Sequence, residues 1–221
     1  MNFFQILALL GNGCLVSLSV FLLTLLFALP LGLLICFGRM ARFRPLSVLF
    51  RFYISVMRGT PLMLQLFVVY YGPYYLFRIR LSELGSNWLF LAVIIGFTLN
   101  YAAYFAEIYR AGISAMSAGQ YEAARVLGMT RPQTFFLIIL PQVFRNILPA
   151  LGNEIITLVK DTSIAFAIGL IEMFTRAKLL ASEQVSLLPY LAAGCIYYFF
   201  NLAVSFTLSQ AEKRLSRYRI K

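Results

Sequence analysis

The chain alternates long apolar segments with short connections that carry most of its charge. Five apolar segments can be marked off by charge clusters and by Pro or Gly, and each can supply the roughly 20 residues of a membrane-spanning helix. They cover approximately residues 13–38, 48–77, 88–112, 134–170 and 187–210. The pattern predicts an all-α integral membrane protein with about five transmembrane helices, organised as a single domain over residues 1–221.

The fourth apolar segment differs from the others because it is too long for one straight span and contains charge. Glu154, Lys160 and Asp161 all fall within it. A charged residue at the bilayer centre costs roughly 2.5–3.5 kcal/mol on insertion scales. Irregular backbone at that depth is tolerated only where protein or a wet cavity surrounds it. We therefore expect this segment to be bent, broken or partly re-entrant.

Lys and Arg are distributed unevenly among the connections. The basic connections contain Arg39, Arg42, Arg44 and Arg51, then Arg110, Arg125, Arg131 and Arg145, and finally Lys213, Arg214, Arg217, Arg219 and Lys221; the other connections contain only Arg78, Arg80, Arg176 and Lys178. Short loops rich in Lys and Arg remain on the cytoplasmic side of a membrane. The asymmetry predicts an N-terminus outside the cell and a C-terminus in the cytoplasm.

Composition narrows the class of protein further. Hydrophobic residues make up 61% of the chain and charged residues 12%, which is too little charge for the surface of a soluble domain of this length. The chain contains no histidine, and Cys14, Cys36 and Cys195 lie singly within apolar segments. This pattern argues against zinc binding, thiol chemistry and histidine acid–base catalysis. The net charge of +11 is explained by membrane topology, because no aromatic-interleaved basic patch accompanies it.

Ionisable residues within the spans are the candidates for a solute pathway, since such residues usually face a bundle interior or a cavity. They are Arg58, Glu107, Glu154, Lys160 and Asp161. Glu154, Thr157 and Asp161 are spaced by three and four, which places them on one face of a helix. Two carboxylates on one face suit a solute with a positive side chain.

A structural role for the same charges stays open. Lys160 and Asp161 lie roughly 100° apart around a helix, and they are equally consistent with an internal ion-pair network. Arg58 and Thr60 belong to the stretch RGTP. The planar guanidinium of Arg58 suits either binding of a solute carboxylate or capping of neighbouring carbonyls.

Residues 119–129 form a polar stretch that a bilayer cannot easily hold. Gln120 to Leu127 are strong helix formers, and Gly128 stands where a left-handed residue ends a helix. Glu122 lies near the helix N-terminus, where the macrodipole favours an acid. Ala123 and Ala124 would leave the helix surface bare enough for another protein to approach. The alternative is a surface turn that only connects two spans.

This stretch carries a specific resemblance. Glu122, Ala123, Ala124, Gly128, Ile138, Leu140 and Pro141 match the pattern EAA, three residues, G, nine residues, I, one residue, LP. That pattern resembles the loop signature of permease subunits of ATP-binding cassette (ABC) importers. Residues 57–73, 100–113, 119–128 and 148–166 are also similar to the polar amino acid branch of that family, of the histidine, arginine and glutamine type.

The resemblance implies a type I ABC importer permease fold in the bacterial cytoplasmic (inner) membrane. It implies that Glu122, Ala123, Ala124 and Gly128 belong to a coupling helix near residues 119–129 that docks on a cytoplasmic ATPase. The implied partners are a second permease subunit, identical or homologous, two ATPase subunits and an extracytoplasmic solute-binding protein. ATP and Mg would be bound by the ATPase, with no cofactor in this chain, which contains no GxxxxGK[ST] loop.

The expected function is therefore ATP-driven import of a polar, cationic amino acid through a pathway that includes Arg58, Thr60, Glu107, Glu154, Thr157, Lys160 and Asp161. One alternative is a permease for a neutral or acidic polar amino acid, in which the intramembrane charges are structural. A passive channel and a membrane-embedded enzyme are alternatives from other classes. The sequence leaves open which amino acid is carried and whether the two permease subunits are identical.

Overall fold

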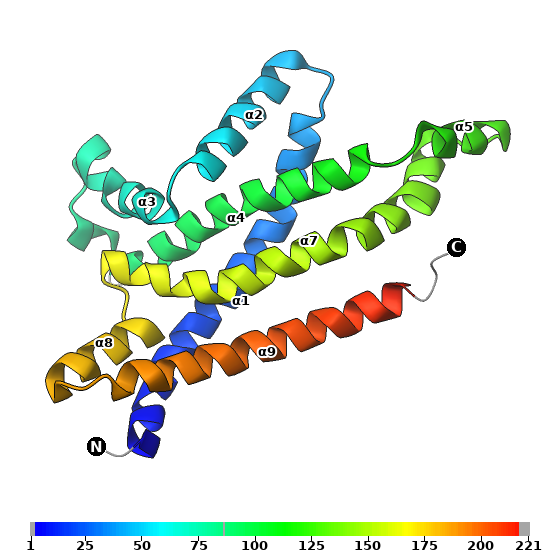
Figure 1. Cartoon of the computed structure of the whole chain (residues 1–221). Helices are drawn as coiled ribbons and strands as arrows, with labels where there is room; N and C mark the ends of the chain where they lie inside the picture. Colours follow the sequence, from blue (N-terminus) through cyan, green and yellow to red (C-terminus); the bar gives the residue numbers. More distant parts are fainter. Residues whose placement is uncertain (1–2, 86, 217–221) are drawn as a thin grey trace.

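The computed structural model describes residues 3–85 and 87–216, and all of its regular elements are helical. In chain order they are α1 (Phe3–Arg39), α2 (Arg44–Gly59), α3 (Leu62–Phe77), the 3₁₀ turn η1 (Leu81–Leu84), α4 (Trp88–Ser114), α5 (Ala118–Val126), α6 (Arg131–Gln133), the π-helical η2 (Thr134–Ile139), α7 (Leu140–Asp161), the 3₁₀ stretch η3 (Thr162–Ile168), α8 (Met173–Gln184) and α9 (Leu188–Ser216) (Figure 1). The expected positive charges at Arg217, Arg219 and Lys221 lie outside the described residues.

Within the described residues, four helical segments are long and apolar enough to cross a membrane. They are Phe3–Arg39, Trp88–Ser114, Arg131–Ile168 and Leu188–Arg214. A fifth crossing is formed if α2 and α3, which meet at a bend of 111°, are taken together as one broken span. The expectation of an all-α fold with about five spans is confirmed.

The broken span is the second segment, a break that the apolar pattern of residues 48–77 did not predict. Thr60 has extended backbone (φ −122°, ψ 147°) between α2 and α3. The physical cause is Pro61, which lacks an N–H and pushes the preceding residue away from helical geometry. In the fourth segment, Arg131–Ile168 remains one helical unit. It begins with α6 and the wider π-helical turns of η2, continues as α7, and ends in the tighter 3₁₀ turns of η3.

Helices α1 and α4 form the centre of the bundle and approach each other closely. A Cβ atom on Gly32 would lie 2.9 Å from Cβ of Phe105 and 3.0 Å from the carbonyl oxygen of Ala102. Small residues allow such approach between membrane helices, where packing replaces the hydrophobic effect as the driving force. Figure 1 shows α1 crossing the group formed by α4, α7 and α9.

A smaller cluster joins the start of α1 to α8 and α9. Its buried members are Ile6, Leu10, Met173, Ala177, Ala192 and Ala193. We call this region the α8 end of the bundle, and the opposite region, where α5 lies, the α5 end; Figure 1 shows them at opposite sides of the molecule. Helix α8 was not anticipated, since the sequence analysis placed a connection between residues 170 and 187.

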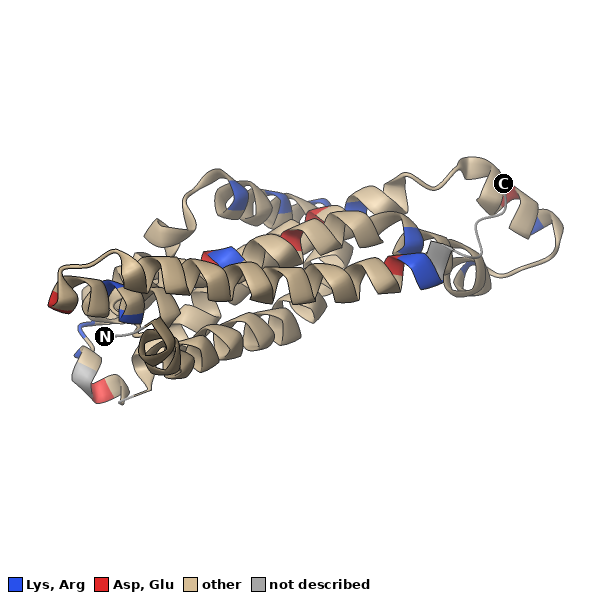
Figure 2. Ribbon diagram, turned by 60° about the horizontal axis from the view of Figure 1, so that its bottom comes forward, with Lys and Arg blue, Asp and Glu red and all other residues tan. Residues whose placement is uncertain are grey.

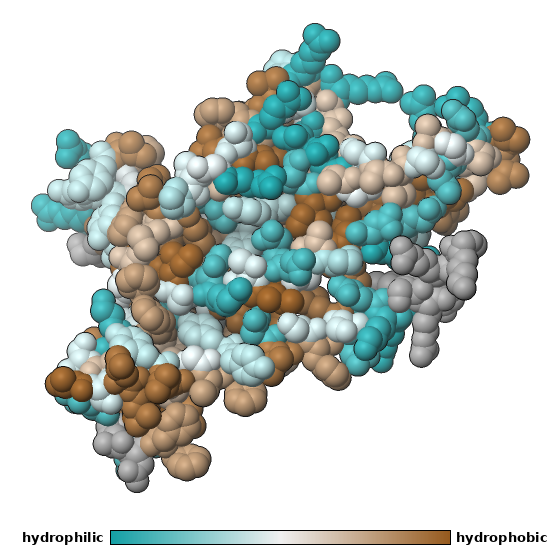
Figure 3. Space-filling model, in the orientation of Figure 1, coloured by the Kyte–Doolittle hydropathy of each residue, from teal (hydrophilic) through white to brown (hydrophobic). Residues whose placement is uncertain are grey.

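Charge is concentrated at both ends of the bundle, and a small number of charged residues lie in the middle of the long helices (Figure 2). On the face seen in Figure 3, patches of hydrophilic side chains lie over α2 and the middle of α7, with apolar surface between them. Polar groups within membrane-spanning segments are candidates for a functional site.

Candidate functional site: α5 and a polar cluster between the spans

Helix α5 projects beyond the ends of α4 and α7 (Figure 1). Its C-terminus is closed by two hydrogen bonds, from the Gly128 N–H to the Arg125 carbonyl (3.0 Å) and from the Met129 N–H to the Ala124 carbonyl (3.0 Å). This is the Schellman arrangement, and it requires the left-handed backbone found at Gly128 (φ +74°). The predicted glycine cap is confirmed.

The exposed surface of α5 differs in part from the expected one. Glu122 and Ala123 are exposed, but Ala124 is only 1% exposed. The expectation that both alanines leave a bare surface is wrong for Ala124, because the packed face of the helix includes it. Val126 and Leu127 are 88% and 76% exposed instead. The signal that could have revealed this surface was the pair of large apolar residues ahead of Gly128 in a water-exposed helix.

The chain after α5 is fixed to the fourth span by a capping box. The side chain of Thr130 accepts a hydrogen bond from the Gln133 backbone N–H (3.4 Å), and Oε1 of Gln133 accepts one from the Thr130 N–H (2.9 Å). Reciprocal capping of this kind satisfies donors at a helix start. The helical unit Arg131–Ile168 begins directly after Thr130 and includes Asp161. Helix α5 is therefore connected to the bundle through this capped helical unit.

A polar cluster lies between α2, α4 and α7, and we define it as Arg58, Tyr101, Tyr104, Glu154 and Asp161. The Tyr101 hydroxyl donates a hydrogen bond to Oδ2 of Asp161 (2.7 Å). The guanidinium carbon of Arg58 lies 5.2 Å from the centre of the Tyr104 ring, and this ring is 6.2 Å from that of Tyr101. Arg58 also interacts electrostatically with Glu154. The cluster thus connects three elements that are distant in sequence.

The predicted polar face of α7 is present, since Glu154, Thr157 and Asp161 all lie in uninterrupted α-helix. Glu154 and Asp161 are half-buried. The Thr157 hydroxyl donates to the Asn153 carbonyl one turn earlier (2.9 Å). Tyr101 was not among the predicted site residues; its only signal in the sequence is a tyrosine pair, Tyr101 and Tyr104, that flanks two alanines in an apolar segment.

Lys160 and Asp161 interact electrostatically but do not form a close ion pair. Among the described residues no ion pair within 4.0 Å joins them, and Lys160 is exposed. The hydrogen-bond partner of Asp161 is Tyr101. Helix geometry explains this outcome, because consecutive residues point in different directions and cannot face each other.

The break between α2 and α3 is stabilised by two side-chain amides. Nε2 of Gln65 donates to the carbonyls of Met57 (3.0 Å) and Thr60 (3.1 Å) and to the Thr60 hydroxyl (2.8 Å). Nδ2 of Asn100 donates to the Met57 carbonyl (3.1 Å) and to Oε1 of Gln65 (2.9 Å). Gln65 and Asn100 thus supply the donors to the Met57 and Thr60 carbonyls, and capping of other carbonyls by Arg58 stays a prediction.

Glu107 belongs to a separate ion-pair group. Its carboxylate accepts two hydrogen bonds from Nε of Arg110 (both 3.1 Å), and Nε of Arg39 lies 3.5 Å from its Oε2. This group joins the last residue of α1 to α4. Glu107 thus has basic partners within 4.0 Å, which neither Glu154 nor Asp161 has among the described residues.

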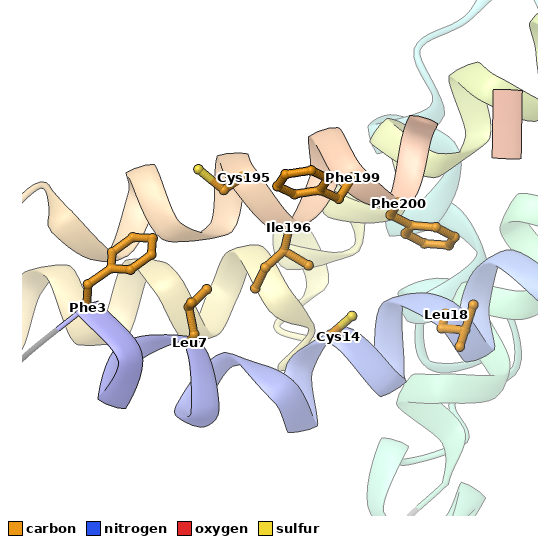
Figure 4. A pocket seen from close by; sticks show the side chains of 8 residues that line it. All are labelled: Phe3, Leu7, Cys14, Leu18, Cys195, Ile196, Phe199 and Phe200. Atoms are coloured by element: carbon orange, nitrogen blue, oxygen red, sulfur yellow. The ribbon is translucent and has the colours of Figure 1, made fainter. Parts of the chain in front are cut away.

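An apolar groove of about 510 Å³ lies between the first half of α1 and α9 (Figure 4). Its lining consists of Phe3, Leu7, Cys14, Leu18, Cys195, Ile196, Phe199 and Phe200. Recognition of a polar molecule needs a few placed polar groups, and the lining offers only carbon and thiol surfaces. The groove is thus unsuited to a polar solute, and the polar cluster is the better candidate site.

A bundle of apolar spans with a polar cluster between them and a capped helix projecting from one end defines a membrane transport subunit. Residues 15–217 match the family described as binding-protein-dependent transport system inner membrane component. The chain belongs to this family.

Relatives and a solved structure agree with this assignment. The L-cystine transport system permease protein TcyB of Bacillus subtilis (strain 168) is 36% identical over 95% of this chain and 87% of its own length. The arginine transport system permease protein ArtQ of the same organism is 37% identical over 92% and 91%. A putative glutamine permease, GlnP of Rickettsia conorii (strain ATCC VR-613 / Malish 7), is 35% identical over the same shares.

The chain is similar in fold to a crystal structure of an amino acid ABC transporter with histidines. The TM-score is 0.85 at 34% identity, covering 97% of this chain and 99% of the other. A methionine ABC transporter, MetNI, shares the fold alone (TM-score 0.64, 16% identity, covering 93% and 94%). This chain is therefore a permease subunit of an amino acid ABC importer of the bacterial inner membrane, and ATP is hydrolysed by a separate subunit.

Proposed function

We propose that this permease carries a cationic amino acid, and that Glu154 and Asp161 recognise its positive side chain. The supporting observation is a pair of half-buried carboxylates on one face of a membrane-spanning helix. In the described part of the chain neither carboxylate has a Lys or Arg nitrogen within 4.0 Å. Acids at this depth normally pair with a cation, and a cationic solute would supply it.

Arg58 fits the other end of such a solute. Its guanidinium lies over Tyr104 and interacts electrostatically with Glu154. A planar guanidinium binds a carboxylate through two parallel hydrogen bonds. An amino acid with its α-carboxylate at Arg58 and its side chain towards Asp161 would complement both charges of the polar cluster. Thr60, Thr157 and Lys160 would line the same pathway.

One observation favours a second candidate, a permease for a neutral or acidic polar amino acid. Asp161 already accepts a hydrogen bond from Tyr101, which is 2% exposed. This bond would hold Asp161 as part of the scaffold between α4 and α7. The names of the relatives include cystine, glutamine and arginine systems, so similarity supports both candidates equally.

We further propose that the α5 end faces the cytoplasm and that α5 docks on the ATPase. The unequal distribution of Lys and Arg supports this orientation, with the N-terminus outside. Glu122, Ala123, Val126 and Leu127 provide the exposed docking surface, and Gly128 sets its shape. The ATPase would bind ATP and Mg, and this chain would bind no cofactor.

A second permease subunit, identical or homologous, would complete the pathway. Asn153 and Lys160 are exposed within a membrane-spanning helix. Contact of such residues with lipid is costly, so a neighbouring subunit or an aqueous path between subunits should cover them. An extracytoplasmic solute-binding protein would then deliver the amino acid at the α8 end.

Substitution of Glu154 by Gln tests the charge recognition. In the variant transporter, reconstituted with its ATPase, uptake of arginine and lysine should fall by about tenfold or more, while uptake of glutamine changes little. The reason is that removal of one partner from a buried ion pair costs several kcal/mol. Glu183→Gln, at an exposed position of α8, serves as the matched control. Equal losses for charged and neutral solutes would contradict the proposal.

A further inference from the structure

Glu172 is a fully buried carboxylate outside the polar cluster, and the sequence analysis did not single it out. Its exposed fraction is 0%, and it directly precedes α8. Its Oε2 accepts a hydrogen bond from the Phe174 N–H (2.7 Å), and its Oε1 accepts from the Thr175 N–H (2.8 Å) and hydroxyl (3.0 Å). Glu172 therefore caps the first turn of α8, where free amides need an acceptor.

The same carboxylate also contacts two spans. The hydroxyls of Ser17 in α1 and Tyr197 in α9 donate to its Oε2 at 3.3 and 3.2 Å. Ser17 in turn accepts from the Met173 N–H (3.2 Å). One buried side chain thus holds three helices together through hydrogen bonds alone, since within the described residues no Lys or Arg forms an ion pair with it.

Capping a helix with a fully buried carboxylate carries a desolvation cost, because the charged group is removed from water. Burial raises the pKa of the Glu172 carboxyl above its ordinary value, although the hydrogen bonds from Phe174, Thr175 and Tyr197 act in the opposite direction. Ser, Thr, Asp or Asn would satisfy the same amides at lower cost from the usual capping position. The longer side chain is required only if the contacts with α1 and α9 matter as well.

Tyr197 connects this carboxylate to the polar cluster. Besides Glu172, its hydroxyl interacts with the hydroxyl of Thr162, which directly follows Asp161 and has an exposed fraction of 0%. The Thr162 hydroxyl donates to the Val159 carbonyl (2.8 Å). A continuous path therefore runs from Asp161 through the adjoining Thr162 to Tyr197 and then to Glu172.

The backbone between the two groups contains a turn. Gly169 is left-handed (φ +91°) and ends η3, and the Thr175 hydroxyl donates to the carbonyl of Leu170 (2.9 Å). Two backbone hydrogen bonds close the turn, from the Gly169 N–H to the Phe166 carbonyl (3.0 Å) and from the Leu170 N–H to the Ala165 carbonyl (3.3 Å). The contacts of Tyr197 before the turn and of Glu172 after it add side-chain connections to α9 and α1.

We infer that Glu172 is a positioning residue for transport. Acting through Tyr197, it fixes the position of the backbone that carries Asp161 relative to α1 and α9. The inference rests on the proposed role of Asp161 in solute recognition. Solute affinity, and not only the stability of α8, should then depend on Glu172 and Tyr197.

Two substitutions separate positioning from simple capping. Tyr197→Phe removes the hydroxyl but leaves Glu172 free to cap α8. Glu172→Gln keeps an acceptor for the amides, and its neighbouring hydroxyls can reverse to accept from the new amide. Glu172→Ala removes all acceptors at once. Tyr198→Phe, one residue further along α9 and 62% exposed, is the matched control.

The experiment measures uptake of arginine and of glutamine by the complete transporter in proteoliposomes, together with amide exchange in residues 170–180. Tyr197→Phe should raise the apparent KM of the transported solute about fivefold with the amides of Phe174 and Thr175 still protected. Glu172→Ala should raise KM further and expose those amides, while Glu172→Gln should stay within about twofold of the parent. Tyr198→Phe should change nothing.

An unchanged KM in Tyr197→Phe would overturn the inference and leave Glu172 as a helix cap, and this variant decides the matter even if Glu172→Ala does not accumulate. The proposed solute site fails separately. If Glu154→Gln and Asp161→Asn leave the uptake of both solutes unchanged, the role of Asp161 is wrong whatever Tyr197→Phe does.

Discussion

Tyr101 and Asp161 are joined by a hydrogen bond of 2.7 Å, although 60 positions separate them in the chain. The donor lies in the middle of α4 and the acceptor is the last residue of α7, so the bond fixes the end of one span against the centre of another. The bond engages Oδ2, so in the proposed function Oδ1 of Asp161 would contact the solute. This relationship makes Tyr101 part of the site that the charges of α7 define.

Removal of the Tyr101 hydroxyl should weaken uptake of cationic amino acids. In Tyr101→Phe the carboxylate of Asp161 loses a donor that orients it, and a hydrogen bond to a charged group contributes roughly 1.5–3 kcal/mol. The apparent KM for arginine should therefore rise by about tenfold, as measured by uptake in proteoliposomes. Tyr104→Phe is the control, because the ring under Arg58 is retained. Parent-like uptake by Tyr101→Phe would exclude a role for this bond in recognition.

The contact between α1 and α4 should tolerate no added atom at Gly32. A Cβ there would lie 2.9 Å from Cβ of Phe105, so one helix must move. Overpacking of this kind destabilises a protein by about 1–3 kcal/mol. Gly32→Ala should lower the thermal midpoint of the detergent-solubilised protein, whereas Gly11→Ala in the same helix, with nothing within 4 Å, should not. Equal thermal midpoints for the two variants would show that α1 and α4 have room for a methyl group at Gly32.

A bulky residue on the exposed side of α5 should block the ATPase without disturbing the bundle. Ala123→Trp adds volume to the proposed docking surface, whereas Gly119→Ala adds one methyl group where nothing lies within 4 Å. We expect the first variant to insert into the membrane normally and to lose co-purification with the ATPase, and the second to keep it. Co-purification of Ala123→Trp at the parental level would place the docking surface elsewhere.

The proposed docking surface on α5 is connected through the chain to the polar cluster. The capping box of Thr130 and Gln133 begins a helical unit that reaches Asp161 and continues into η3. The unit links the region next to α5 to the carboxylates of α7 through continuous helical turns. In the proposed mechanism, closure of the ATPase would move α5, and the carboxylates of α7 would move with it relative to α4.

Much of the architecture follows from local sequence. The apolar segments became spans because a bilayer offers no partner to backbone N–H and C=O groups, so any crossing segment must form a helix. The cap at Gly128 and the shared face of Glu154, Thr157 and Asp161 also came from spacing alone, since helix periodicity and left-handed glycine caps depend on a few adjacent residues.

The sequence by itself determined which segments are helical spans, where α5 ends and which residues of α7 share a face. Only the tertiary structure decided that Ala124 packs inward, that Asp161 bonds to Tyr101 and that Glu172 joins α1, α8 and α9. The physical reason is the range of the interactions. Helix formation depends on neighbours within about four residues, whereas these contacts depend on which faces of distant helices meet.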